Sequence, residues 1–292
     1  MRRVIRRSFS SSSEILHEWA GLKHHNMSHS MDTVTLTKHA NGVVDLKLNR
    51  PQKFNAMNMQ MFLDIETAFH QINQDATVKC VILSAEGNHF SAGIDLEALM
   101  GLRALTSDVE CPARQRECMA NVISRLQRII SLPEKCHAPT IAAVHGLCIG
   151  AGVDLVSACD LRVCVDTATF CVKEIDLAIV ADLGTLQRLP NIVGQQRARE
   201  MAFTGRDVKG PEALQVGLVL ESFLDVQAMS TYASKLAGTI SKKSSITMRG
   251  IKESMNFSMD HTVDEGLQNV LRWNAAHLLS DDLEKLISRI QK

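Results

Sequence analysis

Residues 145–154 read His-Gly-Leu-Cys-Ile-Gly-Ala-Gly-Val-Asp, and they join two segments of different character. The apolar run before them, residues 139–144, is typical of a strand, and the segment that opens near Ala151 predicts a helix. A glycine-rich turn between a strand and a helix is typical of an α/β unit. Residues 92–94, Ala-Gly-Ile, repeat this pattern between another predicted strand and helix. The sequence therefore predicts an α/β fold with a largely parallel sheet.

The same periodicities divide the chain beyond its first 30 residues into two parts. Residues 31–225 alternate strands with helices and form the predicted core, whereas residues 226–292 show helical periodicity only. The apolar faces of this C-terminal region exceed what one small bundle can hide, so we expect it to pack on another subunit. Strands are predicted at residues 43–49, 78–84, 139–144, 161–165 and 170–172, and helices at 58–74, 114–132, 232–240, 246–255, 262–279 and 280–291.

The composition limits the class of protein. The 292 residues include 32 Lys plus Arg and 32 Asp plus Glu, so the formal net charge is zero, and 45% of residues are hydrophobic. This balance argues against a general nucleic-acid or membrane-surface binder, which would normally carry a basic face. No apolar run approaches the roughly 20 residues that span a bilayer. A small anionic ligand held by a few local Lys or Arg residues is compatible with zero net charge.

The first 30 residues differ from the rest in composition. Arg2, Arg3, Arg6 and Arg7 precede five serines, and no acidic residue occurs before Glu14. Such an Arg- and Ser-rich, acid-poor segment is typical of a mitochondrial transit peptide, and the alternative is a basic tail without a targeting role. The chain ends Ile-Gln-Lys, not with a Ser-Lys-Leu peroxisomal signal. We therefore expect residues 1–30 to be a transit peptide and linker, and the protein to lie in the mitochondrial matrix.

Cysteine and histidine give no strong metal or redox pattern. The eight cysteines form no C-x-x-C pair, which after a mitochondrial leader favours reduced, mostly buried side chains. A catalytic cysteine is the alternative. His24, His25 and His29 resemble a metal cluster by residue type, but they lie in the polar stretch after the leader, where a solvated linker is expected. We predict no metal site.

The two glycine-containing turns place backbone N–H groups where they lack partners. Residues 92–94 and 150–152 each lie between a strand and a helix, where amides are unpaired and the helix dipole is positive. Two such N–H groups that converge on one oxygen form an oxyanion hole. The alternative is that the glycines only permit tight turns. The sequence contains neither a phosphate-binding G-x-x-x-x-G-K-[ST] loop nor the G-x-G-x-x-G spacing at residue 150, so nucleotide binding is poorly supported.

Three carboxylates, Asp154, Glu174 and Asp182, lie in apolar stretches of sequence. Burial of a carboxylate among Val, Leu, Ile and Ala is unfavourable unless the group is paired or used. For each acid the alternative is a structural role, in a helix cap or a salt bridge. Asp154 falls in a predicted first helical turn, where an acid is electrostatically favoured, and Asp95 is expected to cap the helix that starts near Leu96.

From about Val34 to the end, the chain resembles the crotonase (enoyl-CoA hydratase/isomerase) superfamily. Within it, residues 172–176 and 181–190 resemble the dienoyl-CoA isomerase branch closely, and the motifs together cover nearly the whole mature chain. Two departures are Ala151, where the family more often has Gly, and Ala178-Ile179, which replaces a Gly-Leu common in this branch. The other matching segments are Asn49-Arg50-Pro51, Asn55-Ala56-Met57, Phe90-Ser91-Ala92-Gly93-Ile94-Asp95 and Ala142-Ala143-Val144-His145-Gly146.

The resemblance implies a crotonase (ClpP-like) spiral of ββα units with a C-terminal helical trimerisation region, assembled as a homotrimer or homohexamer. It implies an acyl-CoA substrate whose thioester oxygen is bound by the backbone N–H groups of Ile94 and Ala151. The substrate-binding loop would comprise Ser91, Ala92, Gly93, Ile94 and Asp95. No cofactor is expected, since CoA is part of the substrate. Lys53 and Lys252 are weak candidates for contacts with its phosphates.

The acids distinguish two chemistries within this family. Positions matching Asp154 and Glu174 are both Glu in the hydratases, and a third acid at a position like that of Asp182 is usually absent there. The resemblance thus favours isomerisation of a 3,5-dienoyl thioester to the 2,4-diene, in which a proton leaves C2 and another arrives at C6. Glu174 would be the base, Asp182 the acid, and Asp154 a neighbour that tunes them. A 2-enoyl-CoA hydratase, and a non-catalytic scaffold or RNA-binding protein of this fold, are the alternatives.

Overall fold

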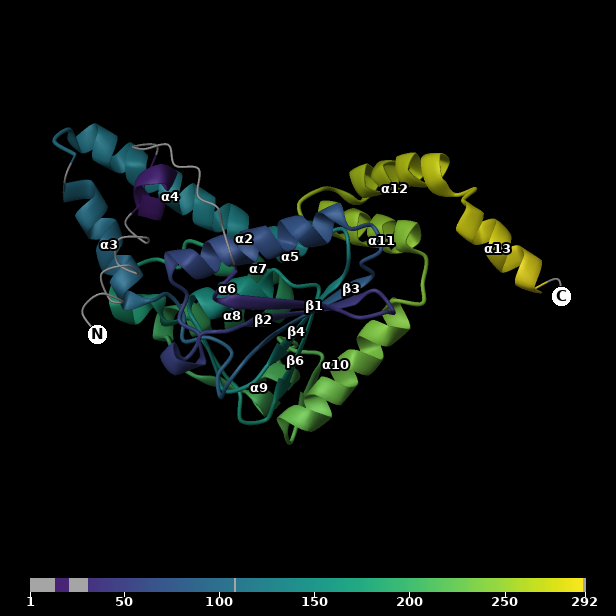
Figure 1. Cartoon of the computed structure of the whole chain (residues 1–292), viewed down its shortest axis with the longest axis horizontal. Helices are drawn as coiled ribbons and strands as arrows, with labels where there is room; N and C mark the ends of the chain where they lie inside the picture. Colours follow the sequence, from purple (N-terminus) through teal and green to yellow (C-terminus); the bar gives the residue numbers. More distant parts are fainter. Residues whose placement is uncertain (1–13, 21–30, 108, 291–292) are drawn as a thin grey trace.

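A computed structural model describes residues 14–20, 31–107 and 109–290. Its centre is a six-stranded sheet with the order β1-β2-β3-β4-β6-β9 (Figure 1). The first pair, β1 and β2, is an antiparallel hairpin, and every later neighbour is parallel. The predicted, largely parallel α/β sheet is therefore confirmed. The strands are β1 (Val34–Lys38), β2 (Val43–Leu48), β3 (Cys80–Ala85), β4 (Thr140–Val144), β6 (Leu161–Val165) and β9 (Glu221–Phe223).

A second, three-stranded sheet makes the fold a spiral. It consists of β5 (Leu147–Ile149), β7 (Thr169–Cys171) and β8 (Val208–Lys209), in the order β5-β7-β8. The chain passes from β4 in the large sheet to β5 in the small one, and after a helix it passes from β6 to β7 in the same way. Each ββα unit thus adds one strand to each sheet, as in the crotonase spiral that the sequence predicted.

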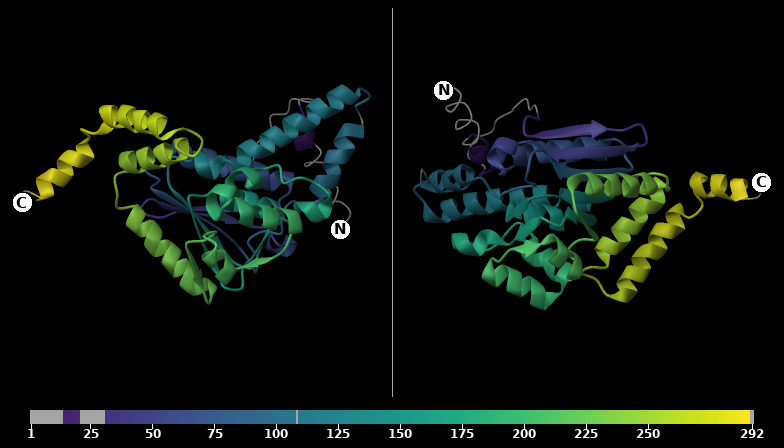
Figure 2. Two further views of the ribbon diagram at one scale, coloured as in Figure 1. Left: turned by 180° about the vertical axis from the view of Figure 1, so that it is seen from behind. Right: turned by 90° about the horizontal axis from the view of Figure 1, so that it is seen from below.

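Helices surround the two sheets and extend from them at both ends (Figures 1 and 2). One of them, α10, packs on β3, β4, β6 and β9, and α2 packs on β1. Asn58 caps α2 by accepting a hydrogen bond from the N–H of Met61. The helices are η1 (Pro51–Lys53), α2 (Met59–Gln74), α3 (Leu96–Ser107), α4 (Pro112–Ile130), α5 (Leu132–Lys135), α6 (Ala151–Ser157), η2 (Lys173–Leu177), α7 (Thr185–Val193), α8 (Gln195–Thr204), α9 (Gly210–Gln215), α10 (Val226–Ile240), α11 (Ser245–Phe257), α12 (Val263–His277) and α13 (Asp281–Ile290).

Part of the predicted leader and linker is packed against the core. Residues 14–19 form a short helix, and Ile15 and Leu16 belong to the hydrophobic core. The guanidinium of Arg125 on α4 lies 5.6 Å from the ring centroid of Trp19. The Arg- and Ser-rich residues 1–13 and the three histidines at 24, 25 and 29 lie outside the described residues, so the transit peptide stays a prediction.

The C-terminal helices differ in how they contact the body. The last two, α12 and α13, extend away from it at the end opposite to α3 and α4 (Figures 1 and 2). Their large apolar side chains are exposed, for example Leu267 and Leu271 on α12 and Ile290 on α13. The predicted boundary at residue 225 stays a prediction, because α10 begins there but packs on the large sheet. No helix in residues 14–20, 31–107 or 109–290 is both long and apolar enough to cross a bilayer.

A buried ion pair attaches α11 to the core. Lys252 is 6% exposed, and its ammonium donates to the carboxylate of Asp160 at 2.7 Å and to the backbone oxygen of Pro133 at 2.7 Å. The same carboxylate accepts from the backbone N–H and hydroxyl of Thr140 at the start of β4. The suggestion that Lys252 contacts CoA phosphates was therefore wrong, because its donors are already used inside the protein.

Lys252→Ala should lower the free energy of unfolding by about 3 kcal/mol, because it leaves the Asp160 carboxylate partly buried without its cation. The exposed Lys242 on the preceding turn is the control, and Lys242→Ala should change stability by less than about 0.5 kcal/mol. Urea unfolding of both variants at one protein concentration measures the difference. Equal small effects would show that this ion pair contributes little.

Ala178, which stands where this branch commonly has Gly, adopts a left-handed conformation. Its φ is +56° and ψ is 34°, at the residue that ends η2. A Cβ atom is unfavourable in this region, by roughly 1–2 kcal/mol, whereas glycine adopts it freely. The departure from the family pattern thus introduces local strain next to the turn that carries Glu174.

Ala178→Gly should raise the free energy of unfolding by up to about 1 kcal/mol, since removal of the Cβ relieves this strain. Ala228→Gly, at an exposed position in the regular helix α10, should instead lower it by about 0.5–1 kcal/mol. Thermal unfolding of the two variants tests whether the free energy of unfolding changes in opposite directions. Destabilisation by both changes would contradict the strain at residue 178.

Candidate active site

The two glycine turns lie side by side. The backbone N–H of Ser91 donates to Leu147 at 2.8 Å, and the N–H of Ile149 donates back to Ser91 at 3.0 Å. Gly93 has a φ of +92°, and a Cβ at this position would lie 2.9 Å from the oxygen of Ile149 and 3.8 Å from the nitrogen of Ala151. Glycine is therefore required for the first turn to approach the second so closely.

Each turn has a free backbone donor. Ala151 is the first residue of α6, so its N–H lies outside the helical hydrogen-bond ladder. Within the part of the chain that the structure describes, neither this N–H nor that of Ile94 has an intramolecular acceptor. Ala151 is compatible with this position because its N–H is unchanged by the extra methyl. The structure thus places two donors from sequence-distant segments next to each other.

A mainly apolar cavity of about 540 Å³ opens beside these turns. Glu174 is one of the charged residues that line it. Lys53, the other phosphate candidate, is exposed and lines this cavity. The lining residues are Lys53, Phe54, Ala56, Ala92, Gly93, Ile94, Asp95, Leu96, Glu97, Ile149, Gly150, Ala151, Lys173, Glu174, Asp176, Leu177 and Ile179.

Glu174 is placed by η2, the short helix that follows β7. Its carboxyl lies against the bare α-carbon of Gly150, where a Cβ would be 3.1 Å from Oε1. The other oxygen, Oε2, is buried and has no hydrogen-bond partner among the described residues. Burial raises the pKa of Glu174 to about 7, and the charges of Asp154 and Asp182 contribute in the same direction. An acid with an unsatisfied buried oxygen and this pKa is suited to accept a proton near neutral pH.

Asp154 lies in the first turn of α6 and is 1% exposed. Its Oδ1 accepts a hydrogen bond of 2.7 Å from the backbone N–H of Thr185 at the start of α7. Burial raises the pKa of Asp154 to about 6, although the hydrogen bonds from Thr185 act in the opposite direction. This carboxyl therefore has both a structural partner and an electrostatic effect on Glu174.

Asp182 lines a different, more polar cavity of about 480 Å³, together with Arg188 and residues of α4 and α11. Partial burial raises the pKa of its carboxyl, and the backbone oxygen accepts a 2.7 Å hydrogen bond from Gln127 on α4. The charge of Asp182 raises the pKa of both Asp154 and Glu174. The three predicted acids thus interact electrostatically, and among the cavities of the described residues Glu174 lines the apolar one and Asp182 the more polar one.

Ser91 and Asp95 have structural partners in the substrate-binding loop that the sequence suggested. The hydroxyl of Ser91 donates to the backbone oxygen of Asn55 at 2.9 Å and accepts from the N–H of Gly93 at 3.2 Å. Asp95 accepts from the N–H of Glu97 and forms an ion pair of 3.0 Å with Arg50. Its expected capping of α3 is confirmed, because α3 begins at the next residue.

Arg50 and Asn55 lie in segments that match the family, but the sequence alone predicted no role for either of them. Asn55 is fully buried with a φ of +53°, and its amide donates to the backbone oxygens of Glu86 and His89. Its side-chain oxygen accepts from the N–H of Arg50 at 2.7 Å. These bonds shape the loop before the first glycine turn. The available signal was the place of both residues in the segments that match the family.

The cysteines are free thiols, and most of them are buried. Of the eight cysteines, all are free and only Cys111 is exposed. Across the described ranges, no group of three or more His, Cys, Asp or Glu side chains is arranged to hold a metal ion. The buried cysteines therefore pack as small apolar side chains.

Comparisons with known proteins agree with this fold and these motifs. The family described as enoyl-CoA hydratase/isomerase matches residues 38–285. A peroxisomal Delta(3,5)-Delta(2,4)-dienoyl-CoA isomerase of Arabidopsis thaliana is 42% identical over 84% of this chain and 88% of the plant protein. The mitochondrial enzyme of the same name from Homo sapiens is 41% identical over 89% of this chain and 79% of the human protein.

A solved structure gives the same result for the fold. The enoyl-CoA hydratase of Bacillus anthracis superimposes with a TM-score of 0.79 and 27% sequence identity, covering 89% of this chain and 96% of the bacterial chain. The family match spans both sheets except for most of β1, and most of the helical C-terminal region. The chain therefore belongs to the enoyl-CoA hydratase/isomerase family, the crotonase superfamily that its motifs predicted.

Proposed function

We propose that this protein is an enzyme that converts 3,5-dienoyl-CoA to 2,4-dienoyl-CoA in the β-oxidation of unsaturated fatty acids. The observation that carries the proposal is the buried Glu174 carboxyl, with one unpartnered oxygen and a pKa near 7, beside two free backbone N–H groups. The two named relatives with this activity, each more than 40% identical to the chain, support it.

The reaction needs a base at C2 and a stabilised enolate. Glu174 would accept the C2 proton, and the electron pair would pass to the thioester oxygen and along the conjugated chain. The N–H groups of Ile94 and Ala151 would bind that oxygen, a contribution of roughly 3–4 kcal/mol per donor. Ser91, Ala92, Gly93 and Asp95 would hold the first of these donors in place.

Protonation at C6 would complete the shift of both double bonds, and Asp182 is the proposed donor. The acyl chain must then reach from the cavity of Glu174 to the carboxyl of Asp182, which lines another cavity. Asp154 would keep the acids coupled, since its charge raises the pKa of Glu174. A 2-enoyl-CoA hydratase that uses only Glu174 and Asp154 is the second candidate, because it needs no group in the cavity of Asp182.

The substrate supplies its own CoA, and no further cofactor is proposed. Lys53 at the rim of the cavity is a candidate for contact with the CoA phosphates, as its ammonium is exposed beside the substrate-binding loop. The balanced net charge of the chain gives no support for a nucleic-acid partner.

A homotrimer or homohexamer is the proposed assembly. The exposed apolar side chains on α11, α12 and α13 are too many for an isolated chain in water. A second copy that covers them would also stabilise the extended arm made by α12 and α13.

We place the protein in the mitochondrial matrix, on the Arg- and Ser-rich, acid-poor composition of residues 1–13. The human relative carries the description mitochondrial and the plant relative peroxisomal, so the family occurs in both compartments. The N-terminal composition is what favours the mitochondrion for this chain.

Glu174→Gln and Asp182→Asn should each lower kcat for a 3,5-dienoyl-CoA by about 10²–10⁴-fold with little change in CoA binding. Formation of the 2,4-diene is followed by its conjugated absorbance. Glu221→Gln, at the exposed first position of β9, is the matched control and should retain full activity. In parallel, loss of 2-enoyl-CoA absorbance by water addition would identify a hydratase instead.

Deuterium exchange separates the roles of the two acids. In D2O, Asp182→Asn should still exchange the C2 proton of the substrate while losing the shift to the 2,4-diene, and Glu174→Gln should lose both. Proton NMR of the dienoyl-CoA measures exchange directly. Full isomerase activity in Asp182→Asn would show that the acid in the second cavity takes no part.

The pH dependence of kcat/KM should reflect the raised pKa of Glu174. A base must be deprotonated, so kcat/KM should fall as the pH drops below about 7, the pKa of this carboxyl. Asp154→Asn removes a neighbouring negative charge, so it should lower the pKa of Glu174 and move the acid limb to lower pH. Glu221→Gln should leave the acidic limb of the profile unchanged. If this limb is also unchanged in Asp154→Asn, the charge of Asp154 does not raise the pKa of Glu174.

A further inference from the structure

The turn that carries Glu174 has little support of its own. Only the carboxyl end of Glu174 is enclosed; no residue of η2 is buried as a whole, and the turn ends at the strained Ala178. A proton-accepting carboxyl must nevertheless be held within a fraction of an ångström of its target. The rigidity must therefore come from the elements against which η2 packs, and α8 is one of them.

The contact with α8 is made at Gly205, the residue that ends this helix. Gly205 is left-handed, with φ +58° and ψ 23°, and its N–H closes the helix on the oxygen of Met201. A Cβ at this position would lie 2.9 Å from Cγ2 of Ile175 and 3.4 Å from Oδ2 of Asp176. The two residues after Glu174 thus rest directly on the bare α-carbon of Gly205.

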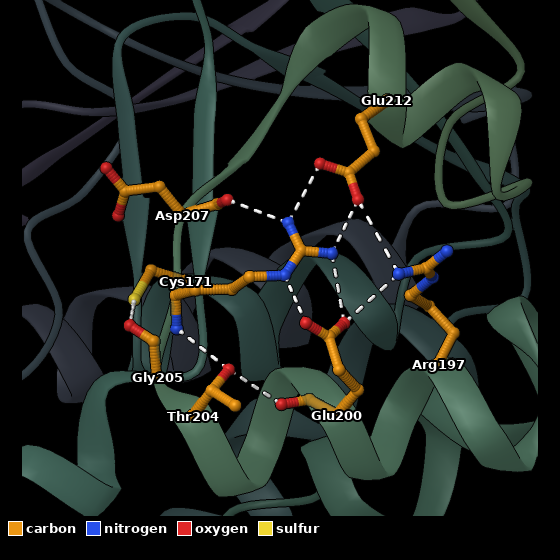
Figure 3. A network of polar contacts seen from close by, with 8 residues as sticks. Cys171, Arg197, Glu200, Thr204, Gly205, Asp207 and Glu212 are labelled. Carbon is orange, nitrogen blue, oxygen red and sulfur yellow. Dashed lines mark hydrogen bonds and ion pairs between the residues drawn. The ribbon is translucent and has the colours of Figure 1, made fainter.

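Cys171 connects this contact to the rest of the site. Its thiol donates to the backbone oxygen of Gly205 at 2.9 Å, and burial raises the pKa of the thiol to about 11, so the donor proton is retained (Figure 3). Its own backbone oxygen accepts from the N–H of Gly150 at 2.9 Å. One residue therefore ties Gly205 to the turn that precedes Ala151.

The end of α8 is itself held by a clamp of charges around Arg206. The guanidinium binds both oxygens of Glu200 on α8 and both oxygens of Glu212 on α9, and it also donates to the backbone oxygen of Asp207 (Figure 3). Arg197 contributes a second cation 3.2 Å from Glu200. Bidentate pairs of this kind fix orientation as well as distance. The clamp thus holds the residue that follows Gly205 in the chain.

We propose that Gly205 is a positioning residue for Glu174: its bare α-carbon, fixed by Cys171 and the Arg206 clamp, is the surface that sets where the Glu174 carboxyl lies. The inference rests on the proposed role of Glu174. A side chain at residue 205 would push η2 away from α8 and displace that carboxyl from the two backbone donors.

The test compares two glycines that both have a positive φ but differ in surroundings. Gly205→Ala adds a Cβ against Ile175, whereas Gly217→Ala adds one at a φ of +77° with its nearest contact at an ordinary 3.6 Å. Gly205→Ala should lower kcat by about 10–100-fold with little change in KM. Gly217→Ala should share the strain and any loss of stability but retain kcat. Equal losses in both variants would overturn the proposal.

A second substitution distinguishes displacement of the turn from strain at residue 205. Ile175→Ala removes the methyl that the new Cβ meets, and Ile175 does not line the cavity of Glu174. Gly205→Ala/Ile175→Ala should therefore recover most of the lost kcat. Absence of any recovery would show that crowding of η2 is not the cause.

A readout without turnover keeps this inference separate from the proposed function. The titration of Glu174 can be followed by the carboxyl 13C signal of labelled protein, assigned with Glu174→Gln. The midpoint should fall in Gly205→Ala, because the displaced carboxyl gains water, and stay unchanged in Gly217→Ala. An unchanged midpoint in Gly205→Ala overturns the positioning role. A wild-type protein inactive on 3,5-dienoyl-CoA overturns the proposed function alone.

Discussion

Desolvation of carboxyl groups is the constraint on which the site depends. Asp154 is almost fully buried, and burial is the largest cause of its raised pKa and of that of Glu174. A buried carboxylate is tolerated where it has partners or where its proton has a use. Asp154 has a partner in Thr185, while one buried oxygen of Glu174 has no partner among the described residues. The fold therefore retains an electrostatic penalty at Glu174, which lines the cavity beside the two glycine turns.

The spiral makes this arrangement possible by bringing distant turns together. Each ββα unit ends one strand in the large sheet and begins another in the small one, so residues near 92 and 150 become neighbours. Glycine at residues 93 and 150 then removes the side chains that would separate the turns from each other and from Glu174. The donors of the site are backbone N–H groups, so a methyl group at Ala151 leaves its donor unchanged.

The sequence predicted regular elements better than their surroundings. Periodicity located β2, α2, β6, α11, α12 and α13 within a few residues, because long or strongly alternating segments follow their local pattern. It started α10 at residue 232 instead of Val226. It missed β5 and β8, which are two or three residues long and exist through pairing with β7. Neither the burial of Lys252 nor the separate cavity of Asp182 could be read from local pattern, since both depend on contacts between distant helices.

An isomerase must begin each turnover with one group deprotonated and another protonated, and it must end with those states exchanged. Isolated acids near their ordinary pKa of about 4 would both be ionised at neutral pH, and neither would have a proton to give. Here the charges of Asp154 and Asp182 act on Glu174, and all three pKa values are raised. A coupled set of this kind shares a proton near neutral pH, so the loss of a proton from one acid favours its retention by another. If the acids act as proposed, the return of the proton between turnovers would require only a redistribution within the set, and a third acid would have a function that two isolated carboxylates could not fulfil.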